Sequence, residues 1–214
     1  MLNYKFIAIE GNIGAGKTSL AKQIATSYNT TLILEQFEEN IFLPKFYEDP
    51  SKYALPVELS FLADRHQQLK KEVLKDVFKN NVIADYFFLK SMVFASGNLN
   101  TEEMELYTNL FTIINESLPK PDLFVYLHQN VENLLINIKK RGRSYEQTIQ
   151  ADYLQKVENN YFDFFKKTND LRIVIIDISH LDFSNRGENY QHLIKVINKP
   201  YDIGITYQTI DINQ

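Results

Sequence analysis

The sequence predicts an α/β fold with a doubly wound, five-stranded parallel sheet that carries a phosphate-binding loop (P-loop). Two observations support this fold class. Short apolar runs alternate with amphipathic segments along the 214 residues, which is typical of a parallel sheet covered by helices on both faces. The first apolar run leads directly into Gly11–Thr18 (GNIGAGKT), which fits G-x-x-x-x-G-K-[ST] and indicates a phosphate-binding loop between a strand and a helix.

The first part of the chain is assigned from runs of apolar residues and from their helical spacing. In order, the expected elements are a strand at Tyr4–Glu10, a helix at Lys17–Tyr28, a strand at Thr31–Glu35, an irregular stretch with at most one helical turn at Gln36–Lys52 and a long helix at Tyr53–Lys79. Pro56 is compatible with that helix only near its start.

The second part continues the alternation of strands and helices. The expected elements are a strand at Asn81–Asp85, helices at Phe87–Ala95 and Thr101–Ser117, a strand at Leu123–Leu127, helices at Val131–Lys140 and Ala151–Lys167 and a strand at Leu171–Ile176. Gly97 is expected to end the first of these helices. Asn100 or Thr101 is expected to cap the second, with Glu102 and Glu103 in its first turn.

Length and composition favour one domain over residues 1–214, because 44% apolar residues suffice for a core. A net charge of −4 disfavours nucleic-acid binding, and the absence of Cys excludes disulfides and thiolate metal sites. No apolar run reaches the length of a membrane span, and Lys5 and Glu10 interrupt the first run, unlike in a signal peptide. We therefore expect a cytoplasmic protein with no membrane or nucleic-acid partner.

The phosphate-binding loop indicates a nucleotide such as ATP. Its glycines let successive backbone N–H groups point at phosphate oxygens, Lys17 reaches the β- and γ-phosphates, and the Thr18 hydroxyl can bind Mg²⁺. The alternative is a glycine-rich turn that binds nothing, which the flanking strand and helix disfavour. The predicted ATP-binding residues of the loop are Gly11, Asn12, Ile13, Gly14, Ala15, Gly16, Lys17, Thr18 and Ser19.

Other sequence motifs, and the composition of the predicted acceptor region, narrow the class of reaction. No D-x-x-G is present, and Asn198-Lys199 continues as Pro200-Tyr201, which disfavours a switch GTPase. A nucleoside monophosphate kinase needs several arginines around its anionic acceptor, but Arg65 is the only arginine between Gln36 and Lys70. That region is instead aromatic and acidic, which suits a neutral, hydroxyl-bearing ring system: Phe37, Glu38, Glu39, Phe42, Phe46, Tyr47, Glu48, Asp49, Tyr53, Glu58 and Phe61.

Two carboxylates end predicted strands, where parallel α/β sheets bind their ligands. Glu35 is a candidate acceptor for the proton of an attacking hydroxyl, and Asp85 a candidate ligand for Mg²⁺. The alternatives are a solvent-facing glutamate and an ordinary turn aspartate. Arg141 and Arg143 are candidates for a lid that clamps the transferred phosphoryl group, although Arg141 also suits any helix carboxyl end.

Most of the chain, from Tyr4 to about Phe183, resembles the deoxynucleoside kinase family. The resemblance rests on IEGNIGAGKT, Glu35, FYEDPSKYALPVELSFLADR, ADY at Ala84–Tyr86 and KRGRSYEQ at Lys140–Gln147. Within the family the sequence is most similar to bacterial deoxyguanosine kinases. This resemblance implies a homodimer that transfers the ATP γ-phosphate to the 5′-hydroxyl of a deoxynucleoside, with Mg²⁺.

The resemblance also implies roles for single positions. They are Glu35 at the 5′-hydroxyl, Tyr47 and Glu146 at the 3′-hydroxyl, Glu58 and Arg65 at the base edge, Arg141 and Arg143 in a lid at about residues 141–147, and Asp182 and Phe183 at the donor adenine. Many relatives have Glu-Arg-Ser in place of Ala84–Tyr86, so the role of Asp85 stays open between metal, base and acceptor. Lys90 lies where many relatives have an acidic base-reading residue.

Deoxyguanosine is the first choice of substrate. A carboxylate only accepts hydrogen bonds, and guanine presents two adjacent donors, N1–H and the 2-amino group. Arg65 only donates, which suits O6 and N7 of the same base. The alternatives are a helix-surface role for Glu58, a different or broader base specificity (deoxyadenosine or pyrimidine deoxynucleosides), a nucleoside monophosphate kinase, and a non-catalytic nucleotide-binding module.

Overall fold

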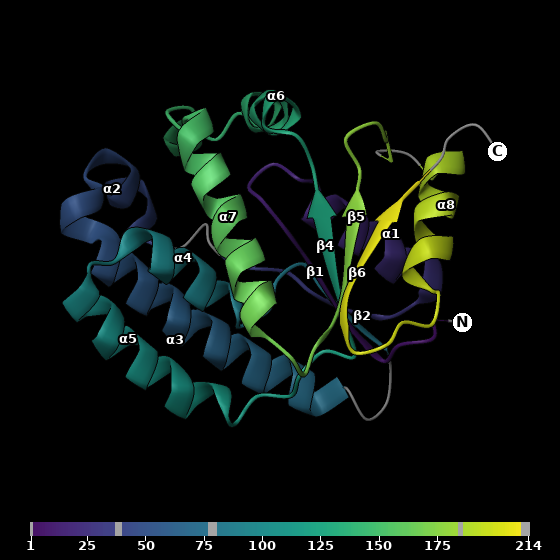
Figure 1. Ribbon diagram of the computed structural model, residues 1–214, viewed down its shortest axis with the longest axis horizontal. Coiled ribbons are helices and arrows are strands. Elements are labelled where there is room, and N and C mark those ends of the chain that lie inside the picture. Colours follow the sequence, from purple (N-terminus) through teal and green to yellow (C-terminus); the bar gives the residue numbers. More distant parts are fainter. Residues whose placement is uncertain (1, 37–39, 77–80, 184–185, 211–214) are drawn as a thin grey trace.

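The computed structural model describes residues 2–36, 40–76, 81–183 and 186–210. Within these ranges it contains a six-stranded sheet in the order β2-β3-β1-β4-β5-β6, and every pair of neighbours is parallel (Figure 1). The strands are β1 (Phe6–Gly11), β2 (Thr31–Ile33), β3 (Val82–Ala84), β4 (Leu123–His128), β5 (Arg172–Asp177) and β6 (Gly204–Thr209). The predicted parallel α/β fold is confirmed, with one strand more than predicted.

Helices cover both faces of this sheet (Figure 1). They are α1 (Lys17–Tyr28), α2 (Leu43–Glu48), α3 (Pro50–Asp76), α4 (Lys90–Asn98), α5 (Thr101–Asn115), α6 (Val131–Arg141), α7 (Ala151–Lys167) and α8 (Glu188–Ile197), and a short 3₁₀ helix spans Ser144–Glu146. None of the helices in the described ranges is long and apolar enough to cross a bilayer.

The core has two halves because strand residues alternate between the faces of the sheet. Ile7 and Ile9 of β1 belong to a buried cluster with residues of α1, α6 and α8. Phe6 and Ala8 belong to a second cluster, with residues of α3, α4, α5 and α7. The strands are therefore buried on both sides, which explains why their sequences are continuous apolar runs.

The number of strands was predicted wrongly, because β6 and the preceding α8 were missed. β6 (GITYQT) is an edge strand beside β5, and most of its residues are partly exposed, so it lacks a continuous apolar run. Helix α8 does carry a helical spacing of buried residues at Tyr190, Leu193, Ile194 and Ile197. The sequence contained that signal, and the prediction overlooked it.

Gly97 does not end α4 as predicted, since the helix continues to Asn98. A Cβ atom at Gly97 would lie 2.4 Å from Nδ2 of Asn160 on α7, so this glycine permits close contact between two helices. The cap of α5 is as predicted: Asn100 and Glu103 form a reciprocal capping box.

The start of α3 also differs from the prediction. This helix begins at Pro50, three residues before the predicted Tyr53, and α2 supplies the helical turn allowed in the stretch before it. The predicted end at Lys79 lies outside the described residues.

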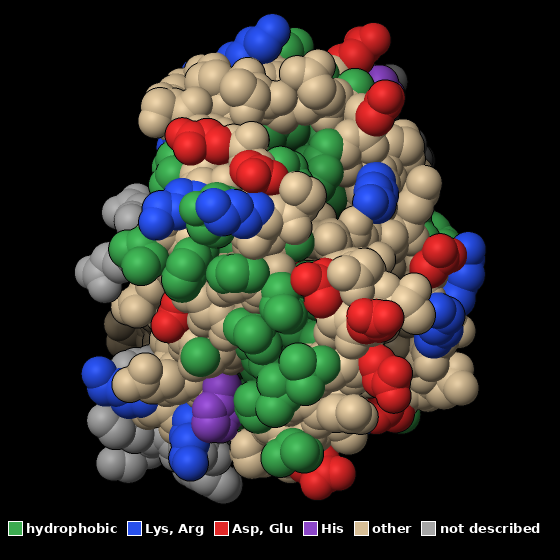
Figure 2. All heavy atoms as spheres, turned by 90° about the vertical axis from the view of Figure 1, so that its left-hand side faces the viewer, with side chains coloured by type: hydrophobic (Ala, Val, Ile, Leu, Met, Phe, Trp, Pro, Cys, Tyr) green, Lys and Arg blue, Asp and Glu red, His purple; other side chains and the backbone are tan. Residues whose placement is uncertain are grey.

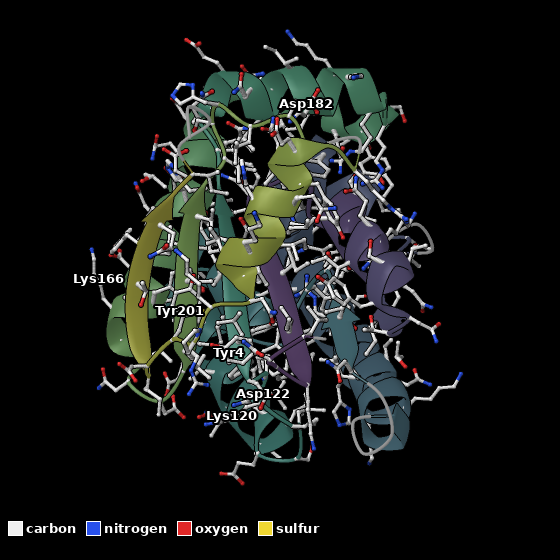
Figure 3. The ribbon with its side chains drawn as sticks, turned by 90° about the vertical axis from the view of Figure 1, so that its right-hand side faces the viewer. Tyr4, Lys120, Asp122, Lys166, Asp182 and Tyr201 are labelled. Atoms are coloured by element: carbon white, nitrogen blue, oxygen red, sulfur yellow. The ribbon has the colours of Figure 1, made fainter. Side chains whose placement is uncertain are left out.

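The carboxyl ends of the strands all lie at one edge of the sheet. Figure 3 shows Asp182, which follows β5, at the opposite end of the molecule from Tyr4 and Asp122, which precede β1 and β4. Asp122 fixes that lower end, because its Oδ2 accepts hydrogen bonds from the backbone N–H groups of Lys5 and Phe6, both at 2.9 Å. The predicted site residues are consequently found at the other edge.

Candidate active site

The phosphate loop joins β1 to α1, as predicted. Gly14 and Gly16 adopt φ angles of +86° and +85°, which side chains disfavour. A Cβ atom on Gly14 would also lie 2.8 Å from the carbonyl oxygen of Leu134 on α6. The Asn12 side chain donates to the carbonyl oxygen of Leu154 on α7 at 2.7 Å, so it positions the loop, and the predicted role of Asn12 in ATP binding stays a prediction for its backbone N–H.

Lys17 begins α1 and folds back over the loop. Its Nζ donates to the carbonyl oxygens of Gly11 and Asn12 at 2.9 and 2.8 Å. Burial lowers the pKa of Lys17 to about 8; Lys90 adds to this effect, and the nearby carboxylate of Glu10 opposes it. Phosphate oxygens bound in the loop would supply the anionic partner that this ammonium group needs.

Two carboxylates follow adjacent strands. Ile33 of β2 pairs with Ala84 of β3, so Glu35 and Asp85 lie at the same edge of the sheet. Asp85 Oδ1 accepts a hydrogen bond from the backbone N of Glu35 at 2.7 Å, and Asp85 Oδ2 accepts one from Thr18 Oγ1 at 2.5 Å. Asp85 therefore connects the phosphate loop to the segment that carries Glu35.

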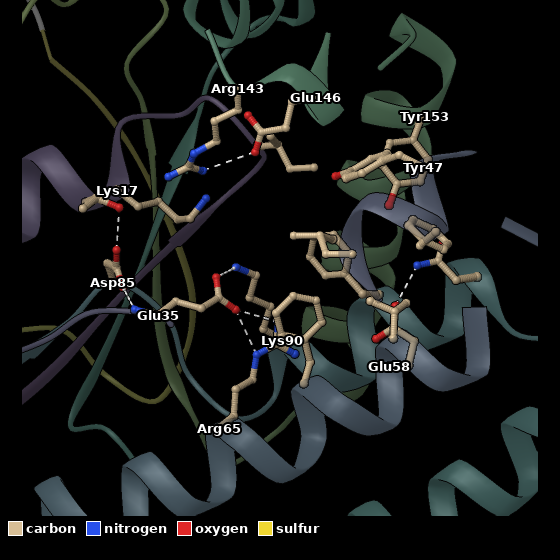
Figure 4. A pocket seen from close by; sticks show the side chains of 18 of the residues that line it. Lys17, Glu35, Tyr47, Glu58, Arg65, Asp85, Lys90, Arg143, Glu146 and Tyr153 are labelled. Carbon is tan, nitrogen blue, oxygen red and sulfur yellow. Dashed lines mark hydrogen bonds and ion pairs between the residues drawn. The ribbon is translucent and has the colours of Figure 1, made fainter. Parts of the chain in front are cut away.

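Glu35 is held by two cations (Figure 4). Arg65 of α3 donates from Nε and Nη2 to Glu35 Oε1 at 2.9 and 2.6 Å, and Lys90 Nζ lies 2.5 Å from Glu35 Oε2. Burial acts to raise the pKa of Glu35, but Lys90 and Arg65 outweigh it and lower the pKa to about 2. Glu35 is thus ionised at neutral pH, accepts hydrogen bonds and is a weak base.

The partners of Arg65 and Lys90 were not evident from the sequence, which placed both residues near the base. The third nitrogen of the Arg65 guanidinium, Nη1, donates to Ser91 Oγ at 2.8 Å, and its Cζ lies over the Phe61 ring, 4.7 Å from the ring centroid. Arg65 and Lys90 are buried, and the side chain of the Glu35 that they neutralise is 12% exposed. The three side chains form one wall of a pocket.

This pocket, called the acceptor pocket below, is lined by aromatic rings as well as by charged side chains. Its rings are those of Phe46, Tyr47, Phe61, Phe94 and Tyr153. Tyr47 also stacks against Tyr145, with ring centroids 6.0 Å apart. The predicted acceptor residues Phe37, Glu38 and Glu39 lie outside the described part of the chain.

Glu58 lies on the α3 side of the acceptor pocket and is 3% exposed. Its Oε1 accepts a hydrogen bond from Nδ2 of Asn98 at 2.7 Å (Figure 4). Its Oε2 is buried and has no hydrogen-bond partner among the described residues. A buried, unsatisfied carboxylate oxygen is costly, so Glu58 has unused capacity for a ligand in this pocket.

The predicted lid, residues 141–147, lies above the pocket. Arg141 and Arg143 both form ion pairs with Glu146, the second at 3.2 Å between Nη1 and Oε1. Glu146 is 5% exposed and also lines the acceptor pocket. The lid arginines and the carboxylate expected at the 3′-hydroxyl are thereby brought together.

A second pocket, called the donor pocket, lies between the phosphate loop, α6 and the segment after β5. Ser19, Asp182 and Phe183 line it. The Phe183 ring packs against Gly16, and its carbonyl oxygen accepts a hydrogen bond from Gln23 Nε2 at 2.9 Å. The Asp182 carbonyl oxygen likewise accepts one from an α8 side chain, that of Asn189.

Phe94, Asn98 and Tyr153 also line the acceptor pocket and were not predicted from the sequence. Phe94 and Asn98 lie on α4 and Tyr153 on α7. Their spacing resembles that of residues packed in the core, so no motif marks them. Asn137, on α6, donates to the Gly14 carbonyl oxygen at 2.9 Å and so contacts the phosphate loop.

A phosphate loop that lies between two pockets, at the carboxyl edge of a parallel sheet, defines a kinase of the P-loop class. The family model described as "Deoxynucleoside kinase" matches residues 7–201. The chain belongs to the deoxynucleoside kinase family, and it is a phosphotransferase that uses a nucleotide as phosphate donor.

Individual relatives differ in the base that their names specify. The deoxyguanosine kinase of Bacillus subtilis (strain 168) is 33% identical over 195 residues, covering 88% of this chain and 93% of the relative. The deoxyadenosine/deoxycytidine kinase of the same bacterium is 25% identical over 197 residues, covering 89% and 90%. A structure of deoxyadenosine kinase from M. mycoides with bound products has a TM-score of 0.78 and 26% identity, covering 90% of this chain and 98% of that one.

Proposed function

We propose that this deoxynucleoside kinase transfers the γ-phosphate of ATP to the 5′-hydroxyl of deoxyguanosine. The observation that carries the proposal is the junction of the donor and acceptor pockets. The residues that line both pockets are Lys17, Thr18, Arg141 and Arg143. A phosphoryl group at this junction would lie between cations of the loop and of the lid, as phosphoryl transfer requires.

On the acceptor side, Glu35 orients the 5′-hydroxyl by accepting its hydrogen bond. The transition state of phosphoryl transfer is loose, so the hydroxyl proton leaves late and a strong base is not needed. This agrees with a pKa of about 2 for Glu35. Tyr47 and Glu146 hold the 3′-hydroxyl, and binding of the sugar then competes with the ion pairs between Glu146 and the lid arginines.

The base is read by Glu58. Its partnerless Oε2 and its Oε1 accept the N1–H and 2-amino donors of guanine, which satisfies the buried carboxylate. Arg65 uses Nε and one hydrogen of each terminal nitrogen on Glu35 and Ser91. The remaining two hydrogens are available to O6 or N7 of the base.

Mg²⁺ fits the oxygen atoms at the junction. Thr18 Oγ1 and Asp85 Oδ2 lie 2.5 Å apart beside the phosphate loop, and Mg²⁺ is commonly bound by one or two protein oxygens together with phosphate oxygens and water. These two residues would hold it. When bound, the ion neutralises phosphate charge; Lys17, Arg141 and Arg143 add the protein's own positive charge around the transferred group.

The proposal is tested by measuring transfer of radiolabelled phosphate from ATP to each of the four deoxynucleosides, with and without Mg²⁺. We expect the highest kcat/KM with deoxyguanosine, because it alone offers two adjacent donors to an ionised Glu58, and we expect EDTA to abolish activity. A preference for deoxycytidine or thymidine would refute the assignment of guanine as the base but not the assignment of deoxynucleoside kinase activity. Activity in EDTA would refute the metal assignment.

We also propose a homodimer that uses α5. Its Leu106, Leu110 and Ile113 are 51%, 37% and 70% exposed, and their spacing places them on one face of the helix. Hydrophobic side chains gather along the middle of the molecular face shown in Figure 2, on the side of α3 and α5. A contiguous exposed apolar face is typical of a protein–protein interface.

Light scattering at micromolar concentration should give twice the 25.1 kDa mass of the chain. Ile113→Lys should shift the mass toward the monomer, because it places a charge in the interface. Ile203→Lys is the matched control, since Ile203 is 62% exposed and lies outside α5. A wild-type mass near 25.1 kDa would exclude the dimer.

A further inference from the structure

Glu58 lies in an unusual environment for a carboxyl group that faces a ligand pocket. It is almost fully buried, one oxygen accepts a hydrogen bond from a neutral amide, and the other has no partner among the described residues. The two cations whose charges act on it, Arg65 and Lys90, are both paired with Glu35. No described cation therefore forms an ion pair with Glu58.

The balance of these effects leaves Glu58 titrating near neutral pH. Burial raises the pKa of Glu58 to about 7; the Asn98 hydrogen bond and the charge of Arg65 oppose the rise, while Glu35 adds to it. By contrast, Glu35, which lines the same pocket, has a pKa of about 2. Two carboxyl groups in one pocket thus differ in charge state at pH 6–7.

The two phenols beside Glu58, those of Tyr107 and Tyr153, do not titrate in this range. Tyr107 of α5 donates to the Glu58 carbonyl oxygen at 3.4 Å, and Tyr153 of α7 interacts with Asn98. Burial and the charge of Glu58 raise the pKa of both phenols well above 10. Both phenols therefore remain neutral between pH 6 and 8. A proton taken up by these three groups in that range resides on Glu58.

We propose that the protonation state of Glu58 selects between two purines in the same pocket: the ionised carboxylate reads guanine, and the protonated carboxyl group reads adenine. This inference rests on the proposed function, in which Glu58 faces the base. It adds a second substrate, deoxyadenosine, and a rule for when that substrate is used. Asn98 acts as a positioning residue, because its hydrogen bond fixes one oxygen of Glu58 and stabilises the ionised form.

The rule follows from the N1 atom of each base. Guanine N1 carries a hydrogen and needs an acceptor, whereas adenine N1 is an acceptor and needs a donor. A carboxylate only accepts, but a protonated carboxyl group donates from one oxygen and still accepts at the other. The second oxygen can therefore receive the 2-amino group of guanine or the 6-amino group of adenine. Each mismatch would leave two donors or two acceptors facing one another.

This scheme fixes how base preference depends on pH. The kcat/KM for deoxyguanosine is proportional to the ionised fraction of Glu58, and the kcat/KM for deoxyadenosine is proportional to the protonated fraction. The ratio of their kcat/KM values then rises about tenfold per pH unit, or about 100-fold from pH 6 to pH 8. Titration of groups that serve both substrates, such as Lys17, affects both rates equally and cancels in the ratio.

The experiment measures kcat/KM for both purines from pH 6 to 8 with wild type, Glu58→Gln and Asn98→Ala. The logarithm of the ratio should rise with a slope near one for wild type and stay flat for Glu58→Gln, whose amide does not titrate. For Asn98→Ala we expect the same slope, displaced to higher pH, because the ionised form loses a hydrogen bond. A merely structural role for Asn98 would leave the pH midpoint of the deoxyguanosine kcat/KM profile unchanged, whereas loss of the hydrogen bond moves that midpoint to higher pH.

Calorimetry on the wild-type protein gives a measurement that needs no variant. At pH 7, in buffers of different ionisation enthalpy, deoxyguanosine binding should release about half a proton and deoxyadenosine binding should take up about half. A pH-independent ratio, proton exchange of the same sign for both purines, or no deoxyadenosine turnover at pH 6 would overturn the inference. Failure to phosphorylate any deoxynucleoside would instead refute the proposed function.

Discussion

Lys17→Ala should lower kcat about 10²–10³-fold, because it removes a preorganised positive charge from the phosphate site. Lys17 lies at the junction of the donor and acceptor pockets, where the proposed function places the transferred phosphoryl group and its developing charge. It makes no contribution to the buried hydrophobic clusters. The loss should therefore appear in turnover, measured with saturating nucleoside and ATP, and the variant should keep its circular dichroism spectrum.

The control for this variant is Lys22→Ala. Lys22 is an exposed lysine five residues further along α1, so the same truncation should leave kcat unchanged. Because Lys17 also bridges the carbonyl oxygens of Gly11 and Asn12, thermal melting of both variants must accompany the kinetics. An unchanged kcat in folded Lys17→Ala protein would refute the assignment of the loop as the phosphate site.

Strands in the centre of the sheet were predictable, because β1 and β4 are buried on both faces and consist almost entirely of apolar residues. The edge strand β6 was not, since it has one neighbour and partly exposed residues. The role of Gly97 was predicted wrongly for a related reason: this glycine permits close contact with Asn160, which lies 63 residues away in the sequence. Local patterns cannot distinguish a helix end from a close helix contact.

Site residues were predictable where a short motif, or a position at the end of a strand, marks a residue type suited to the chemistry. The phosphate loop is defined within eight residues, and Glu35 and Asp85 follow parallel strands whose ends must converge. The partnership of Glu35 with Arg65 and Lys90 could not be predicted, because it joins a strand end to α3 and α4. The same holds for Asn98 and Glu58, which meet only through the packing of α4 against α3.

Glu58→Gln should lower kcat/KM for deoxyguanosine by about 10–10²-fold at pH 8, where Glu58 is ionised in the wild type. The amide presents an N–H donor to a base donor, and each unpaired buried polar group costs ~1–3 kcal/mol. Deoxyadenosine should gain relative to deoxyguanosine, because an amide matches the N1 and 6-amino pair of adenine. Deoxyinosine, which lacks the 2-amino group, should be a poorer wild-type substrate than deoxyguanosine.

The matched control is Glu116→Gln, the same chemical change at an exposed residue beyond the last turn of α5, which should leave the ranking of bases unaltered. Replacing the buried carboxylate by an isosteric amide also removes a charge that no described cation neutralises, so the variant should be at least as stable as wild type. The expected loss is therefore one of recognition, confined to kcat/KM for purines with an N1–H donor. Equal losses for deoxyguanosine and deoxyadenosine, or an unaltered ranking of the four bases, would show that Glu58 does not read the base.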